Sequence, residues 1–178
     1  ALDRAARLLF KLGRASEALP LFQQTLSDRE SILGQDHPDT LTSRNNLASC
    51  LETVGRASEA LTLFQQTLSD RESILGQDHP DTLTSRNDVA HCLETVGRAS
   101  EALTLFQQEL THSNQVLGPD HPATLTRRNN LAYCLESVGR ASEALPLYQQ
   151  TLSDRERILG QDHPDMLDCR HNLGVCLT

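Results

Sequence analysis

The chain has 178 residues, of which 38% are hydrophobic and 22% charged, an ordinary globular composition that is long enough to bury a substantial core. Because only 3% of the residues are aromatic and none is Trp, the core must be built from Leu, Ala, Val and Ile, which favours helices over a sandwich or barrel. A net charge of −8 with no long Lys or Arg run argues against nucleic acid as a partner, and no apolar stretch is long enough to cross a bilayer.

The first segment, residues 1–13, reads ALDRAARLLFKLG and predicts a partial helix that ends at Gly13. It has no initiator Met, no apolar signal core and no small-residue cleavage site. A basic transit peptide is one interpretation. We favour another, the cut edge of a longer protein, because the segment is in register with a truncated copy of the repeat that follows.

The rest of the chain repeats with a period of 42 residues. Segment 14–55 differs from segment 56–97 at only four positions, where Pro20, Asn46, Leu47 and Ser49 become Thr62, Asp88, Val89 and His91. A looser copy covers 98–139. The last unit, 140–178, ends in a helix that no further repeat covers, so we expect residues 1–178 to form a single repeat array.

Each period contains two helical patterns. The first, helix A, covers HPDTLTSRNNLASCLETVG at 37–55, with one apolar stripe and with Pro38 in the first turn after a cap at His37 or Asp36. The second, helix B, covers RASEALTLFQQTLSDRESILG at 56–76. The connection at Gly55 is so short that the two helices must be antiparallel, and a GQDHP link leads to the next pair. The expected core residues are Leu41, Leu47, Ala48, Leu51 and Val54 in helix A, and Ala57, Ala60, Leu61, Phe64, Leu68 and Leu75 in helix B.

The stretch NNLASCLETVGRASEALTLFQQTL resembles a tetratricopeptide repeat, with Ala48, Gly55, Ala60 and Phe64 matching that pattern in order. The period of 42 residues with HPDTL and NNLA is similar to the kinesin light chain type. This resemblance implies an all-α, right-handed solenoid of helix A and helix B hairpins, whose concave A-helix face binds a protein or peptide partner without catalysis. The first helix departs from the pattern, since it lacks the Asn pair.

The repeated His and Cys residues are interpreted as structural. Equivalent residues of successive packed helices lie at least about 8–10 Å apart, so the His of each Asp-His-Pro cannot converge on one metal ion and instead caps a helix. The repeated Cys cannot form disulfides with one another at that spacing, which predicts packed, reduced thiols and a cytoplasmic location. The His residues are His37, His79, His121 and His163, and the Cys residues are Cys50, Cys92, Cys134 and Cys176. We expect no metal site, no cofactor and no catalytic site. Catalysis needs different groups that converge on one point, whereas the repeats place identical groups in a row.

The residues that differ between near-identical repeats indicate the candidate binding face. One helix A position holds Arg7, Ser49, His91, Tyr133 and Val175 in successive copies. Carried over from the resemblance, the concave face comprises Arg4, Arg7, Phe10, Lys11, Asn45, Asn46, Ser49, Glu52, Asn87, Asp88, His91, Glu94, Asn129, Asn130, Tyr133, Glu136, His171, Asn172 and Val175, with Thr42, Thr53, Thr84, Thr95, Thr126 and Ser137 beside them.

Two roles are open for parts of this face. The Asn rows offer both donors and acceptors to an extended peptide, or they bond to a neighbouring repeat. The row of Glu52, Glu94 and Glu136 favours a partner with basic character, or it is a solvated surface. The alternative function for the whole chain is a spacer that self-associates through its exposed terminal helices.

Overall fold

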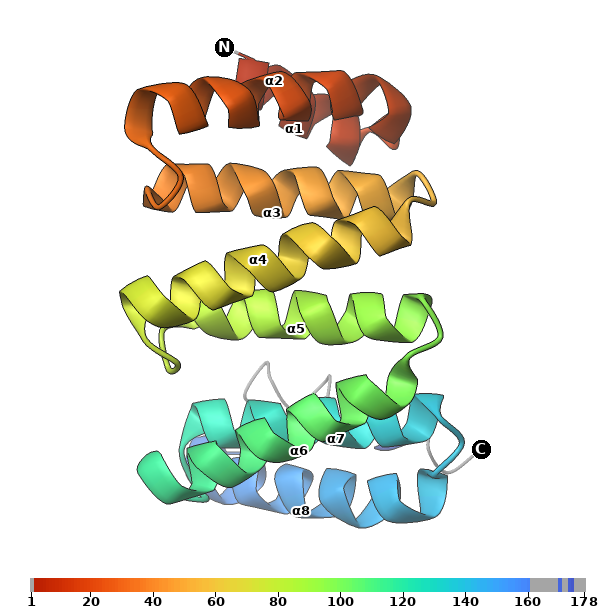
Figure 1. Ribbon diagram of the computed structural model, residues 1–178. Helices are drawn as coiled ribbons and strands as arrows, with labels where there is room; N and C mark the ends of the chain where they lie inside the picture. Colours follow the sequence, from red (N-terminus) through yellow and green to blue (C-terminus); the bar gives the residue numbers. More distant parts are fainter. Residues whose placement is uncertain (1, 161–169, 171–172, 175–178) are drawn as a thin grey trace. The chain divides into compact units, whose positions relative to one another are not determined.

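In the computed structural model, residues 2–160, 170, 173 and 174 are described, and all regular structure in this part of the chain is helical (Figure 1). Eight helices have defined bounds: α1 (Leu2–Lys11), α2 (Ala15–Leu33), α3 (Pro38–Thr53), α4 (Ala57–Leu75), α5 (Pro80–Thr95), α6 (Ala99–Val116), α7 (Pro122–Ser137) and α8 (Ala141–Leu159). Odd-numbered helices are the predicted A helices and even-numbered ones the B helices. No helix among the described residues is long and apolar enough to cross a membrane.

The helix boundaries follow from local sequence. At the start of α3, the backbone N–H of Asp39 donates to Nδ1 of His37, 3.1 Å away, and Pro38 occupies the first turn. At its end, Arg56 N–H donates to the Leu51 carbonyl and Gly55 N–H to the Glu52 carbonyl. This pair of bonds is a Schellman motif, which requires the positive φ of +83° that Gly55 supplies. The predicted cap and turn are therefore confirmed, and His37 rather than Asp36 is the capping residue.

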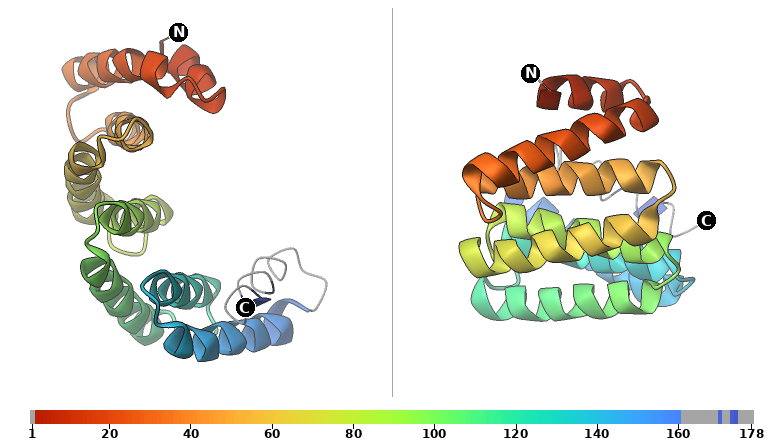
Figure 2. Two further views of the ribbon diagram at one scale, coloured as in Figure 1. Left: turned by 90° about the vertical axis from the view of Figure 1, so that its right-hand side faces the viewer. Right: turned by 45° about the horizontal axis from the view of Figure 1, so that its top comes forward.

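The chain divides into two compact units, Ala1–Arg98 and Ala99–Thr178. In the first unit, α3 packs against both α2 and α4, while α1 packs against α2 and α5 packs against α4. Figure 2 shows α3 and α5 on one side of this unit and α2 and α4 on the other. In the second unit, α7 packs against both α6 and α8.

The small residues of the repeat pattern lie where helices approach most closely. Ala48 and Ala60 are fully buried, and Phe64 is 1% exposed. A methyl side chain at these points allows the ridges of one helix to fill the grooves of the next. The predicted core is confirmed at most positions, although Val54, Ala57, Leu68 and Leu75 are only half-buried.

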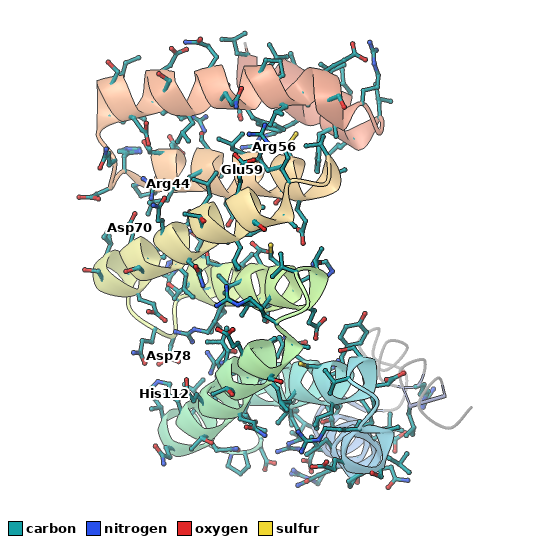
Figure 3. The ribbon with its side chains drawn as sticks, turned by 45° about the vertical axis from the view of Figure 1, so that its right-hand side comes forward. Arg44, Arg56, Glu59, Asp70, Asp78 and His112 are labelled. Carbon is teal, nitrogen blue, oxygen red and sulfur yellow. The ribbon has the colours of Figure 1, made fainter. Side chains whose placement is uncertain are left out.

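Buried and half-buried polar residues join α2 to α3 and α4 to α5, and the periodicity did not predict them. Arg71 in α4 is 5% exposed, and its guanidinium donates to the Asp81 carbonyl at 3.0 Å and to Oγ of Ser85 at 2.7 Å. Arg29 makes the equivalent bonds to Asp39 and Ser43. Arg44 is also buried, and it forms an ion pair with Asp70 (Figure 3). Burial lowers the pKa of Arg71, because the charged guanidinium is removed from water. Its hydrogen bonds to Asp81 and Ser85 offset part of that cost.

Candidate functional site

The candidate site in the first unit is the surface formed by the outward side chains of α1, α3 and α5, which we call the A-helix face. The antiparallel hairpins place these helices in order, and the 42-residue period brings equivalent residues of α3 and α5 side by side. Of the predicted residues, Arg4, Arg7, Lys11 and His91 are exposed, whereas Phe10, Asn45, Asn46, Ser49, Glu52, Asn87, Asp88 and Glu94 are half-buried.

Side chains of α3 and α5 bond directly to one another across this face. Asn45 donates through Nδ2 to Oδ2 of Asp88, 2.8 Å away. Glu52 accepts from the hydroxyl of Thr95 at 3.1 Å, and its Oε1 also lies 3.2 Å from Nδ1 of His91. The Asn45 amide is thus bonded to the neighbouring repeat, although to a side chain rather than to its backbone.

Asp88 is chemically distinct from the Asn that stands at the same place in the neighbouring copies. Burial raises the pKa of its carboxyl, whereas the hydrogen bond from Asn45 and the charge of Arg71 act in the opposite direction. Glu52 adds a second carboxylate, so this part of the face carries acidic groups that a basic ligand could neutralise. The imidazole of His91 stands at its edge with 67% of the side chain exposed.

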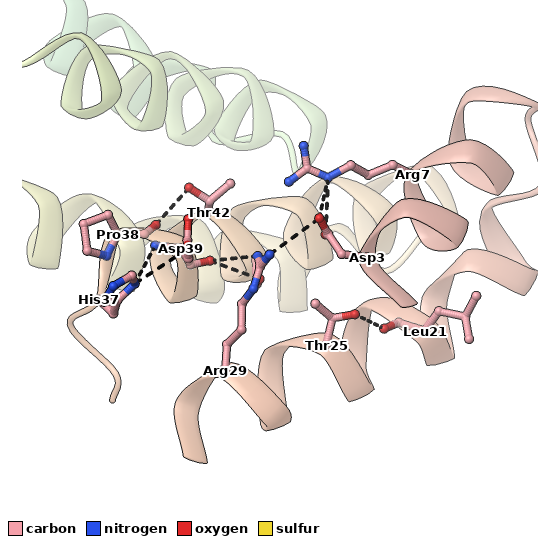
Figure 4. Close-up of polar contacts among 10 residues, drawn as sticks. Asp3, Arg7, Leu21, Thr25, Arg29, His37, Pro38, Asp39 and Thr42 are labelled. Carbon is pink, nitrogen blue, oxygen red and sulfur yellow. Dashed lines mark hydrogen bonds and ion pairs between the residues drawn. The ribbon is translucent and has the colours of Figure 1, made fainter. Parts of the chain in front are cut away.

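The α1 end of the face is basic. Arg4, Arg7 and Lys11 are exposed there. Asp3 forms an ion pair with Arg7 at 3.1 Å and also lies 3.6 Å from Arg29 (Figure 4). Phe10 contacts Phe22 edge to face, with ring centroids 6.1 Å apart. Phe10 therefore packs within the α1–α2 hairpin, and the cationic groups form the accessible part of this wall.

In the second unit, α7 carries the equivalent residues. Tyr133 is 53% exposed, which leaves its ring available to a partner. Glu136 accepts a hydrogen bond from the Tyr148 hydroxyl at 3.1 Å, and Asn129 and Asn130 are half-buried. The predicted residues His171, Asn172 and Val175 lie outside the described part of the chain.

The predicted structural roles of His and Cys are borne out where those residues are described. His79 and His121 cap α5 and α7 as His37 caps α3. Cys50, Cys92 and Cys134 are buried free thiols. Burial raises the pKa of Cys92 to about 11, with a further contribution from Glu52. Within the described residues, no cluster of His, Cys, Asp or Glu could hold a metal ion.

A cavity of about 420 Å³ lies in the first unit away from the A-helix face. Leu26 and Glu30 of α2 and Leu63 and Gln66 of α4 line it, with the Arg44–Asp70 ion pair at its wall. No periodic pattern predicts this cavity, because it lies between two B helices rather than along one helical stripe.

Comparison with known proteins identifies the repeat type. A family model described as tetratricopeptide repeat matches residues 1–73, 54–112, 81–156 and 128–178, which together span the chain. A solved structure of a kinesin light chain-like protein from Podosopora anserina with nearly identical repeats is 27% identical, covers 98% of this chain and 83% of its own, and has a TM-score of 0.80. No curated protein sequence gives a match.

Two less similar structures share the fold. BtubC from P. vanneervenii is 21% identical over 98% of this chain and 70% of its own, with a TM-score of 0.75. Bacillus thuringiensis PlcR, solved in complex with the peptide PapR7 and DNA, is 18% identical over 99% of this chain and 60% of its own, with a TM-score of 0.65. The family match and the likeness to the kinesin light chain-like structure confirm the predicted repeat type, and the helices described above confirm the predicted all-α solenoid class.

Proposed function

This chain belongs to the tetratricopeptide repeat family, and we propose that it is a non-catalytic scaffold whose A-helix face binds a peptide or an extended segment of a partner protein. Tetratricopeptide repeats are commonly interaction scaffolds. PlcR, a neighbour in fold, was solved with a bound peptide, which is consistent with this use of the architecture.

The observation that carries the proposal is the contrast between constant and variable positions in one chain. Positions that pack between helices are nearly identical from copy to copy, as at Ala48, Ala90 and Ala132, which are all fully buried. The position one residue further along α3, α5 and α7 holds Ser49, His91 and Tyr133, and the last two are largely exposed. Variation that packing does not require is best explained by contact with something outside the repeats.

The charges on the first unit support a ligand of defined orientation. Arg4, Arg7 and Lys11 on α1 favour an acidic group, while Glu52 and Asp88 on α3 and α5 favour a basic one. An extended peptide that crosses the A helices would therefore place its acidic residue against α1 and its basic residue against α3 and α5. The reverse orientation would bring like charges together and lose affinity.

Selection from a displayed random peptide library tests the proposal. We would compare the parent with an Arg7→Ala, His91→Ala, Tyr133→Ala variant, and with a matched control in which exposed B-helix residues change, Gln65→Ala, Thr104→Ala and Gln149→Ala. Peptides that bind the parent and the control but not the first variant would support binding by the exposed residues of the A helices, on the A-helix face or on α7. If the folded parent enriches no peptide, the spacer and self-association alternative is favoured instead.

A further inference from the structure

The cavity between α2 and α4 is lined by more negative than positive charge. One of its lining residues is a cation, Arg44, and two are anions, Glu30 and Asp70. Arg44 is 7% exposed and forms a hydrogen-bonded ion pair with Asp70 (Figure 3). Oε1 of Glu30 lies 3.8 Å from Nη2 of Arg44, which is beyond hydrogen-bonding distance. Among the described residues, none donates a hydrogen bond to the Glu30 carboxylate, so this anion is left incompletely paired at the cavity wall.

The later copies of the repeat have one carboxylate fewer at the equivalent positions. The arginine itself recurs as Arg86 and Arg128. The positions equivalent to Glu30 and Asp70 hold Glu72 and His112 in the next copy, and Asn114 and Asp154 in the one after that. Arg86 forms an ion pair with Glu72, and Arg128 forms one with Asp154 at 2.6 Å. One of the two acidic residues is therefore enough for the arginine, and the packing of the repeats does not explain the second acidic residue of the α2–α4 cavity.

We propose that the α2–α4 cavity binds an arginine side chain of a partner protein, with the guanidinium on the Glu30 carboxylate. A guanidinium can donate two parallel hydrogen bonds to one carboxylate, and it is more weakly hydrated than an ammonium group. Leu26 and Leu63 also line the cavity and offer apolar contact to the methylene groups of the arginine stem. Arg44 keeps Asp70 as its partner, so its own charge stays neutralised while the incoming cation pairs with Glu30.

The rim of the cavity and the charge of the chain indicate the source of this arginine. Gln35, Gln66 and Ser69 line the cavity and are exposed, so they can form hydrogen bonds with the backbone on either side of the arginine. The volume of about 420 Å³ falls in the range of ligand sites and leaves room for that backbone. A second copy of this chain carries the same net charge of −8 and is repelled, whereas a partner with a basic surface is attracted.

A peptide titration followed by heteronuclear NMR tests this proposal. The probe is acetyl-Ala-Arg-Ala-amide, and its control contains citrulline, the neutral isostere of arginine. We expect the backbone amide signals of Glu30, Gln66 and Asp70 to shift and saturate with a Kd of about 1 mM, and the citrulline peptide to bind at least about tenfold more weakly. Glu30→Gln, which keeps the shape of the side chain, should weaken binding of the probe at least about tenfold. Asp28→Asn removes the same charge from an exposed position of α2 that does not line the cavity, and it should leave binding unchanged.

Four outcomes would overturn the proposal. The first is no saturable shift of these signals up to about 20 mM probe. The second is equal weakening by Glu30→Gln and Asp28→Asn, because the binding would then reflect only the overall charge of the surface. The third is tighter binding of free butylguanidinium than of the probe, which would assign the cavity to a small cation. The fourth is a dimer of the parent in sedimentation velocity that Glu30→Gln dissociates, since the occupant would then be a second copy.

This proposal is independent of the proposed function, because the cavity lies away from the A-helix face. The Arg7→Ala, His91→Ala, Tyr133→Ala variant should bind the arginine probe as the parent does. Failure of the cavity to bind arginine would leave the A-helix face untouched, and failure of that face to bind peptides would leave the cavity untouched.

Discussion

The buried polar residues at the interface of α4 and α5 can be replaced by those at the equivalent interface of α6 and α7. This replacement tests how the hairpins are joined. The first unit has Thr67, Arg71 and Ser85 at this interface, all at most 5% exposed. The equivalent positions 42 residues later hold Glu109, Ser113 and Arg127, which are also at most 5% exposed. The buried arginine has moved from the B helix to the A helix, and an acidic residue has appeared with it. We predict that the three changes compensate one another.

The structure gives the expected magnitudes. Arg71→Ser removes two hydrogen bonds from a charged donor but recovers the desolvation that lowers its pKa, so it should reduce the free energy of unfolding by about 2 kcal/mol. Ser85→Arg adds a second buried guanidinium beside Arg71, which should cost about 3–5 kcal/mol. The triple variant Thr67→Glu, Arg71→Ser, Ser85→Arg should instead lie within about 2 kcal/mol of the parent, because it reproduces a complete natural set.

Urea denaturation followed by far-UV circular dichroism measures these free energies, with the slope of the transition checked for each variant. The decisive comparison is between Ser85→Arg and the triple variant. If the triple variant is as unstable as Ser85→Arg alone, the three positions do not form one network and the reasoning fails.

Three further predictions concern single residues. Burial raises the pKa of the Asp88 carboxyl in the folded chain, so the folded state binds this proton more tightly than the unfolded state does, and the chain loses stability as the pH rises and the carboxyl ionises. The Asp88→Asn variant should therefore be more stable than the parent at pH 7. This gain in stability should shrink as the pH falls to about 4, where the carboxyl is protonated in both states. A gain that does not vary with pH in denaturation curves would contradict this. Gly55→Ala should lower the unfolding free energy by about 1–2 kcal/mol from its positive φ alone, since nothing lies within 4 Å of the added carbon, and Gly55→Asn should cost less; equal losses in calorimetry would count against it. In a variant that retains only Cys92, the thiol should react with a disulfide reagent at pH 8 far more slowly than after unfolding, because its pKa is about 11 and it is buried; fast reaction of the folded protein would refute that assignment.

Local signals in the sequence predicted the elements and their order. Pro38 and the preceding His fix a helix start, and Gly55 fixes its end, because these residues act on the backbone within one turn. The repeated Ala60 and Phe64 then indicate which side of the helix is buried. Repetition also excluded convergence of the His residues, since equivalent groups in successive hairpins stay a helix diameter apart.

The pairing of polar side chains was decided by the tertiary structure. A periodic pattern locates an apolar stripe on one helix but does not say how far a neighbouring helix is rotated or shifted. The bond between Asn45 and Asp88, the contact of Glu52 with His91 and the burial of Arg71 all depend on that placement. The hairpins and their repetition can therefore be predicted from the amino-acid sequence alone, because short-range backbone chemistry specifies them. The packing of the helices determines which charged groups are buried, which face one another and which stay exposed, because desolvation and hydrogen bonding depend on neighbours that lie 10 to 43 residues away in the chain.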